Sequence, residues 1–385
     1  MFDAHREISR DFILYGAGDC RSGVTGGRAP IAPNPRRGWL VVALLTLAAC
    51  APTTRQSADP AESGNARAAL VGESVPRFTG HEFVTADGQL LPLRKWLPRG
   101  KVKAVILALH GFNDYSNAID GPGKAWAAAG IAIYAYDQRG FGAAPERGRW
   151  PGRAALAADA ATAIKILHRL YPAMPLYLLG ESMGGAVAIV AMTGESGTPI
   201  PDVNGVILVA PAVWGRPTMD LLPKLALWVG VRLAPGLTLT GRGLHIQASD
   251  NIPMLRALAR DPWVIKDTRV DTIWGLVNLM DAALDSAPLL RVRLLLMYGA
   301  ADEIIPSRPM RRFFRTLPQN ATEVRSLAYY EHGYHMLLRD LDSATVIGDV
   351  AGWVLTPGQP LLSGADRGAF EAVSGGTNEA SLGAR

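Results

Sequence analysis

The chain has 385 residues, of which 49% are hydrophobic and 19% are charged. These fractions are typical of a globular protein with a sizeable core, so wholesale disorder is excluded. The 39 Lys and Arg residues against 34 Asp and Glu leave a net charge of only +5. We find no block or helical stripe of basic residues that would follow a phosphate backbone, so nucleic acid is not an expected partner.

The first fifty residues have the pattern of an export signal. Residues 39–49 read WLVVALLTLAA, an uncharged apolar run that follows Arg36 and Arg37. The run is shorter than the ~20 apolar residues of a membrane-spanning helix. Residues 1–49 are therefore expected to be a cleaved signal peptide. The stretch before Arg36 is long for the basic part of such a signal. The alternative is that Met1 lies upstream of the true translation start.

The chain contains two cysteines, Cys20 and Cys50, which excludes a disulfide scaffold and a four-cysteine zinc site. The sequence Leu-Ala-Ala-Cys that ends at Cys50 resembles the lipobox of bacterial lipoproteins. This resemblance implies that Cys50 carries a lipid and begins the mature chain. The protein would then be anchored to a membrane surface of a bacterial cell envelope, facing the periplasm or the exterior. An ordinary secretory signal with a chance cysteine is the alternative.

Two segments lack any apolar periodicity. Residues 50–75 are rich in Ala, Ser, Pro and polar residues and are expected to be a flexible tether. Residues 357–385 have the same character and are expected to be a disordered tail.

The body of the chain alternates short apolar runs with longer amphipathic stretches. The apolar, β-prone runs are residues 102–111, 131–137, 175–181, 203–211 and 293–302. Continuous hydrophobicity indicates strands that are buried on both faces. Helical patterns such as residues 153–170 lie between them. The alternation predicts an α/β fold, with a mostly parallel central sheet and helices on both faces, built from residues 76–212 and 289–356.

Residues 213–288 interrupt this alternation. They show no convincing strand but several apolar helical segments, and they predict a helical cap inserted between two late strands. Two apolar clusters lie in the cap, at residues 221–229 and 274–280. Either both clusters pack against the sheet, or they form a pocket wall and a partly exposed apolar face for an amphiphilic substrate.

The most specific motif is Gly180-Glu181-Ser182-Met183-Gly184, which lies between a predicted strand and a predicted helix. A G-x-S-x-G sequence in this context is typical of a nucleophile elbow, a strained turn with small residues on both sides of the serine. Ser182 is therefore the candidate nucleophile. A glycine-rich packing turn with an idle serine is the alternative.

The chemistry of such a serine needs donors for a developing oxyanion. The N–H of Met183, just after the serine, is one candidate. The loop that begins at His110 leaves the carboxyl end of a predicted parallel strand, where α/β sheets bind ligands, and the N–H of Phe112 is the second candidate. His110 precedes the serine in the chain and is expected to shape this loop rather than to act as a base.

An acid and a base are expected after the serine, each beyond a strand end. Asp302 ends the run LLLMYGAAD and is preferred over its neighbour Glu303 as the acid. His335 lies just before an apolar helical start and is preferred over His332 as the base.

The segments HGFND, YAYDQRGFG, GESMGGA, GAADEIIP and EHGYHML occur in the order and spacing of the α/β-hydrolase superfamily. Over residues 76–356 the chain most closely resembles the monoacylglycerol lipase and lysophospholipase branch. The resemblance implies that Ser182 is the nucleophile, Asp302 the acid and His335 the base. Members of the branch commonly have a histidine where this chain has Glu181.

The resemblance implies a serine hydrolase that cleaves small amphiphilic carboxylic esters, of the monoacylglycerol or lysophospholipid type, and that needs no metal or organic cofactor. A short-chain carboxylesterase, an acyltransferase and other serine-dependent α/β-hydrolases stay open as alternatives. So does a non-catalytic binding protein of the cell envelope. The sequence does not indicate an oligomeric state.

Overall fold

The structure is a computed structural model that describes residues 75–241, 246–318 and 325–374. The predicted signal peptide, Cys50 and almost all of the tether lie outside these residues. Every described element belongs to one compact unit, within residues 52–385. Among the described residues, no helix combines the length and the apolar character that crossing a bilayer requires.

Nine strands of the described residues form one sheet, in the order β1-β2-β3-β5-β4-β6-β7-β10-β11. All neighbours from β5 to β11 pair in parallel, whereas β1, β2 and β3 pair antiparallel. The strands are β1 (Arg77–Phe78), β2 (Glu82–Val84), β3 (Leu90–Trp96), β4 (Ala104–Leu109), β5 (Ile131–Tyr136), β6 (Leu176–Glu181), β7 (Gly205–Val209), β10 (Leu294–Gly299) and β11 (Arg325–Tyr330).

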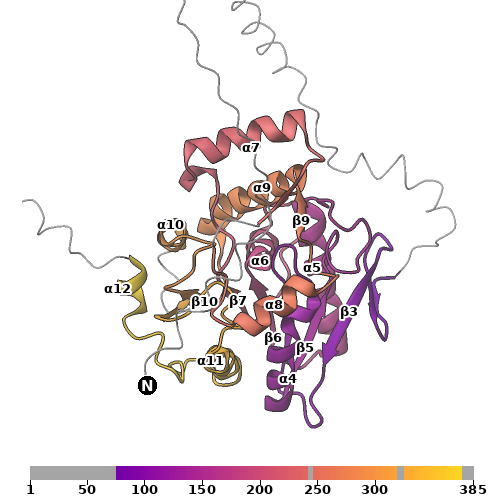
Figure 1. The fold of residues 1–385 in the computed structure, drawn as a ribbon. Helices are drawn as coiled ribbons and strands as arrows, with labels where there is room; N and C mark the ends of the chain where they lie inside the picture. The colour runs from indigo at the N-terminus through magenta and orange to yellow at the C-terminus, as the bar shows by residue number, and fades with distance from the viewer. Residues whose placement is uncertain (1–74, 242–245, 319–324, 375–385) are drawn as a thin grey trace, which may run out of the picture. The chain divides into compact units, whose positions relative to one another are not determined.

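Helices cover both faces of this sheet (Figure 1). One core cluster joins the sheet to α5, α6 and α9, and the other joins it to α4 and α11. Strands β4, β5, β6, β7 and β10 are buried on both faces because they lie between these two clusters. The helices of these layers are α4 (Asp120–Ala129), α5 (Arg153–Leu170), α6 (Met183–Thr193), α9 (Val270–Ser286) and α11 (Ser343–Leu355), with the 3-10 turn η1 (Ser116–Ile119) before α4.

The α/β-hydrolase fold predicted from the sequence is confirmed, with a mostly parallel central sheet. The five predicted parallel strands correspond to β4, β5, β6, β7 and β10, and the helix predicted at residues 153–170 is α5. The antiparallel strands β1 to β3 were not predicted.

The inserted segment differs in part from the predicted helical cap. It contains η2 (Arg216–Thr218), α7 (Leu221–Leu233), β8 (Thr238–Thr240), α8 (Ile252–Arg260), β9 (Asp267–Arg269), α9 and η3 (Ala287–Leu289). Strands β8 and β9 pair antiparallel, so the prediction of a cap without strands is wrong. The strands were missed because each has only three residues, too few for an alternating pattern.

The two apolar clusters of the insertion have opposite environments. Helix α9 packs on α5 and α6, and its residues Val277 and Leu279 are buried. Helix α7 lies over α9 (Figure 1), and its Leu221 and Leu222 are each 77% exposed. Helix α9 is therefore part of the core layer, whereas α7 presents an apolar surface to solvent.

The expectation of a disordered tail from residue 357 is wrong for residues 357–374. This segment contains α12 (Ala369–Ser374), and Leu361 is buried. The N–H of Tyr329 in β11 donates to the carbonyl of Ala365 at 2.8 Å. The average composition of the tail concealed a few apolar residues that reach the core and a backbone stretch that pairs with the edge strand.

Helix α10 (Ser307–Thr316) also corrects the sequence analysis, which found no basic helical stripe. Its sequence SRPMRRFFRT places Arg308, Arg311, Arg312 and Arg315 at helical spacings of three and four residues, which is one face of a helix. Buried Met310, Phe313 and Phe314 interrupt the arginines along the sequence, so that the stripe is not visible as a charge run.

Candidate active site

Ser182 lies in the turn between β6 and α6, with φ of 52° and ψ of −115°. A non-glycine residue at positive φ is strained, and such strain is typical of functional turns. Neighbouring glycines allow the close approach of the elements. A Cβ on Gly180 would collide with the backbone of Gly184, and a Cβ on Gly184 would collide with the carbonyl of Leu109. The structure thus gives the predicted nucleophile elbow its expected geometry.

The predicted base and acid meet at this serine. The Nε2 atom of His335 lies 2.9 Å from Oγ of Ser182, and the Nδ1 atom lies 2.9 Å from Oδ2 of Asp302. Both His335 and Asp302 are buried. With the proton of the imidazole on Nδ1, His335 donates to the carboxylate and accepts from the serine hydroxyl. The three side chains therefore form a continuous chain of hydrogen bonds.

Backbone groups fix the acid and the loop of the base. Oδ1 of Asp302 accepts the N–H groups of Ile304 at 2.8 Å and Ile305 at 2.9 Å, which leaves Oδ2 for the imidazole. The N–H of Tyr334, just before His335, donates to Oδ2 of Asp340 at 2.8 Å. The orientation of the imidazole thus depends on several bonds outside the three central residues.

The rival residues lie away from the serine. Glu303 is exposed and accepts the N–H of Gln247 at 2.7 Å, and His332 is exposed. In the described part of the chain, neither Glu303 nor His332 forms a hydrogen bond with Ser182. The structure therefore brings together the preferred residues of each pair.

The loop after β4 lies against the nucleophile. A Cβ on Gly111 would lie 3.4 Å from Cβ of Ser182, so the backbone that leads into Phe112 passes beside the serine. Met183 is the first residue of α6, where backbone N–H groups lack helical acceptors. Phe112 thus follows the glycine that lies against the nucleophile, Met183 follows the nucleophile itself, and their role as oxyanion donors stays a prediction.

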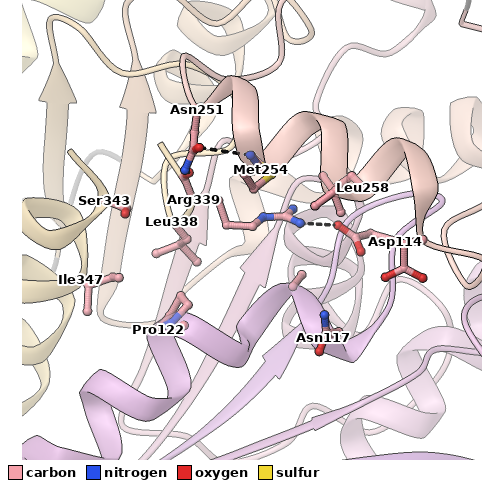
Figure 2. Close-up of a pocket in the computed structure, with 14 residues that line it drawn as sticks. Asp114, Asn117, Pro122, Asn251, Met254, Leu258, Leu338, Arg339, Ser343 and Ile347 are labelled. Atoms are coloured by element: carbon pink, nitrogen blue, oxygen red, sulfur yellow. Dashed lines mark hydrogen bonds and ion pairs between the residues drawn. The ribbon is translucent and has the colours of Figure 1, made fainter. Parts of the chain in front are cut away.

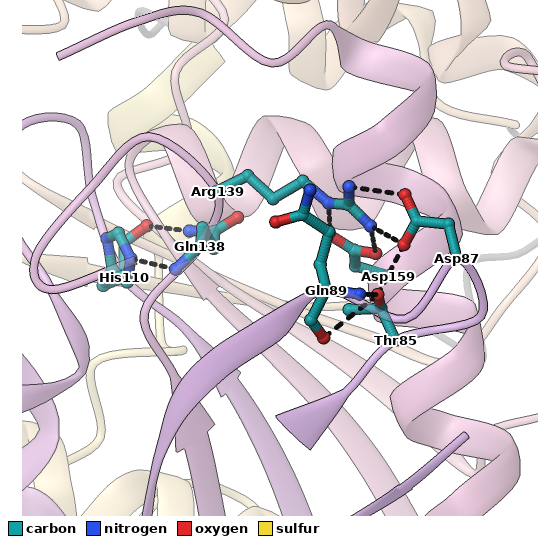
Figure 3. A network of polar contacts seen from close by, with 7 residues as sticks. All are labelled: Thr85, Asp87, Gln89, His110, Gln138, Arg139 and Asp159. Carbon is teal, nitrogen blue, oxygen red and sulfur yellow. Dashed lines mark hydrogen bonds and ion pairs between the residues drawn. The ribbon is translucent and has the colours of Figure 1, made fainter. Parts of the chain in front are cut away.

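His110 shapes this loop, as the sequence analysis expected. Its Nε2 accepts the N–H of Gln138 at 2.9 Å, and the Gln138 amide donates to the His110 carbonyl at 2.9 Å (Figure 3). The Nδ1 atom of His110 lies 2.8 Å from the carbonyl of Gly111. Burial lowers the pKa of His110. A neutral imidazole that binds backbone groups on both sides is a structural link between two loops.

Arg139, which follows Gln138 in the loop after β5, joins elements farther from the site (Figure 3). Its guanidinium contacts Asp159 of α5 at 2.6 Å and Asp87 of the β2–β3 turn at 2.6 Å. Burial raises the pKa of Asp159 to about 6 although Arg139 opposes the shift. Burial also acts to raise the pKa of the more exposed Asp87. The hydrogen bonds to Arg139 and Thr85 outweigh this effect and lower the pKa of Asp87 to about 2.

A buried charge cluster that the sequence did not reveal lies beside the hydrogen-bond chain. Arg339 donates to Oδ2 of Asp114 at 2.7 Å and approaches Oε2 of Glu181 at 3.4 Å. Asp114 belongs to the loop after β4, Glu181 precedes the serine, and Arg339 follows the base by four residues. Burial raises the pKa of Glu181, and the charge of Arg339 opposes this shift. The cluster ties the three loops of the site together.

A cavity of about 350 Å³ opens next to this cluster (Figure 2). Asp114 and Arg339 line it together with residues of α4, α8 and α11, including Pro122, Leu258 and Ile347. The inserted segment thus closes over one side of the active-site loops. The remaining lining residues are Asn117, Ala118, Gly121, Asn251, Met254, Ala257, Asp261, Leu338 and Ser343.

The inserted segment is fastened directly to the loops of the site. The N–H of Ile265 donates to the carbonyl of Asn113 at 2.9 Å, and the Asn113 side-chain amide donates to Oγ1 of Thr268 at 2.7 Å. On the side of the base, the N–H of Met336 donates to the carbonyl of Ala248 at 3.0 Å.

Within the described residues, no group of three His, Cys, Asp or Glu side chains is arranged to hold a metal ion.

Comparison with known proteins agrees with this geometry. The chain is 28% identical to a monoglyceride lipase of Mus musculus over 288 residues, which are 73% of this chain and 92% of the relative. It is 24% identical to a monoacylglycerol lipase of Mycolicibacterium smegmatis, over 72% of this chain and 96% of the relative.

Among solved structures, a soluble variant of monoglyceride lipase from Saccharomyces cerevisiae superimposes with a TM-score of 0.58 at 18% identity, over 74% of this chain and 97% of that one. At this identity the likeness concerns the fold. The model of the family described as "Serine aminopeptidase, S33" matches residues 100–342, a range that contains Ser182, Asp302 and His335. The chain belongs to the serine aminopeptidase, S33 family of α/β-hydrolases.

Proposed function

We propose that the protein hydrolyses carboxylic esters through an acyl-enzyme formed on Ser182. The observation that carries this proposal is the chain of 2.9 Å hydrogen bonds from Ser182 through His335 to Asp302. A serine with a base in reach, and a base oriented by a carboxylate, is the arrangement of nucleophilic acyl transfer. An enzyme that hydrolyses carboxylic esters also agrees with the relatives, which are named as lipases.

The steps of the reaction follow from the positions of these groups. His335 accepts the proton of Ser182 as Oγ attacks the ester carbonyl, and Asp302 stabilises the imidazolium that forms. The N–H groups of Phe112 and Met183 would stabilise the oxyanion, an interaction worth about 3 kcal/mol for each donor. The imidazolium then protonates the leaving alcohol. A water molecule, activated by the same imidazole, releases the acyl group and restores the serine.

We further propose a monoacylglycerol or lysophospholipid as the substrate class. The names of the relatives favour a monoacylglycerol. The exposed apolar face of α7 is suited to contact with amphiphilic esters at a lipid surface. An acyl chain gains roughly 0.8 kcal/mol for each methylene that it buries, so a pocket wall formed by the insertion would favour long chains.

A panel of soluble and amphiphilic esters tests this proposal. We expect kcat/KM to rise from acetyl to dodecanoyl monoesters, and Ser182→Ala to abolish turnover of both. Equal kcat/KM for the two esters would indicate a short-chain carboxylesterase type of site. Transfer of the acyl group to an added alcohol in place of water would indicate an acyltransferase.

The lipid anchor on Cys50 is a separate proposal, supported by the sequence LAAC at the end of the apolar run. One acyl-bearing cysteine would hold the catalytic unit close to a bilayer of the cell envelope. Fractionation of bacterial cells that express the full chain tests this localisation. We expect the full chain in the membrane fraction. Mass spectrometry should find the lipid on Cys50 of the full chain and no lipid modification on the Cys50→Ser chain. An unmodified Cys50 in the wild-type chain would contradict the proposal.

A further inference from the structure

The arginine face of α10 is a surface that ester hydrolysis does not explain. Three of its arginines, Arg308, Arg312 and Arg315, are exposed, and Arg311 is half-buried. The opposite face of the helix fixes its orientation, because Met310, Phe313 and Phe314 are buried in the core.

For three of the four arginines, the described part of the fold offers no compensating carboxylate. Arg308, Arg311 and Arg312 form no ion pair with a carboxylate of the described residues. Like charges three or four residues apart on a helix repel each other and destabilise it by about 0.2 to 0.5 kcal/mol for each pair. An external anion that contacted several arginines at once would relieve this repulsion.

Two elements that pack against α10 each carry an exposed apolar side chain. Helix α10 contacts η3 and α12, where Leu289 is 56% exposed and Phe370 is 55% exposed. The ring of Phe370 lies edge-on to the buried ring of Phe314, with centroids 5.1 Å apart, so its position is tied to α10. We call the four arginines with Leu289 and Phe370 the α10 patch.

We propose that the α10 patch binds the anionic headgroups of a lipid membrane. Guanidinium groups form paired hydrogen bonds with phosphate oxygens, and the surface potential of an anionic bilayer attracts clustered arginines. Exposed leucine and phenylalanine side chains beside such a cluster gain from entering the boundary between headgroups and acyl chains. A nucleic acid would satisfy the arginines but would offer no apolar environment to Leu289. This interaction is independent of the lipid on Cys50 and of the ester chemistry.

Vesicle co-sedimentation of the chain from residue 52 onward tests the inference, because this compact unit contains every described element and lacks Cys50. We expect the protein to bind vesicles of phosphatidylglycerol and phosphatidylcholine, and to bind pure phosphatidylcholine vesicles far more weakly. The triple variant Arg308→Gln, Arg311→Gln, Arg312→Gln should lose roughly 100-fold in partition, since each arginine near an anionic surface contributes about a factor of five. Added salt should weaken the binding of the unmodified protein.

A matched control removes three exposed positive charges elsewhere: Arg99→Gln, Lys101→Gln and Lys165→Gln. This variant should retain most of the partition, and turnover of a soluble ester should show that both triple variants are folded. An equal loss in the two variants would overturn the proposal, because net charge alone would then explain binding. Unchanged binding of the α10 variant, or a preference for an oligonucleotide over anionic vesicles, would overturn it as well.

Discussion

His335 is the residue on which the proposed chemistry depends most closely, because its two ring nitrogens contact the nucleophile and the carboxylate. We expect His335→Ala to lower kcat/KM by about 10⁴-fold or more, since residues that act as a unit cannot substitute for one another. His332→Ala should leave kcat/KM close to that of the unmodified protein, because His332 is exposed. Steady-state kinetics with a soluble ester measures both variants. Comparable losses in the two would show that the base is wrongly assigned.

Arg339 acts on the site through its two carboxylate partners, as a positioning residue. Replacing it by methionine would leave Asp114 and Glu181 buried without their counter-charge, which costs about 3 to 5 kcal/mol of unfolding free energy. Burial already raises the pKa of Glu181. Removal of Arg339 would raise it further, so Glu181 would be protonated, and the penalty reduced, as the pH falls. We therefore expect the stability deficit of Arg339→Met to shrink on acidification.

Urea unfolding of Arg339→Met at several pH values measures this deficit. Arg339→Lys keeps the charge and should be milder, and Glu181→Gln added to Arg339→Met should restore part of the stability at neutral pH. A deficit that is independent of pH, or no rescue by Glu181→Gln, would indicate that Arg339 contributes by packing alone.

At the scale of elements, α7 and α9 show that apolar composition does not determine burial. Leu222 in α7 is 77% exposed, whereas Leu279 in α9 is buried against the core. We expect Leu222→Ser to change the unfolding free energy by less than about 0.5 kcal/mol. Leu279→Ala should lower it by about 2 to 5 kcal/mol. Chemical denaturation of both variants measures the difference, and a large loss in Leu222→Ser would mean that α7 is covered in the folded protein.

A functional prediction follows for the same helix. If α7 contacts amphiphilic substrate, the double variant Leu221→Ser, Leu222→Ser should lose activity on a long-chain monoester in micelles while it retains activity on a soluble short-chain ester. The ratio of the two kcat/KM values is the informative quantity. An unchanged ratio would remove α7 from substrate capture.

For the whole molecule, the sequence predicted the parallel core and the residues that meet at the serine. Both depend on local signals: continuous apolar strands, a G-x-S-x-G turn, and polar residues that directly follow strands. The sequence did not reveal the Arg339 cluster, because its members lie 67 to 225 positions apart and only the fold brings their loops together. The arginine stripe of α10 and the packing of residues 357–374 were missed because buried residues alternate with exposed ones there.

The central claim, that Ser182 is the nucleophile of an ester hydrolase, is tested most directly by a fluorophosphonate probe with peptide mapping of the adduct. The account predicts one adduct for each chain, located on Ser182, with loss of monoacylglycerol hydrolysis in proportion to labelling, and no adduct in Ser182→Ala. An adduct on another residue, or full hydrolysis by the labelled protein, would contradict it.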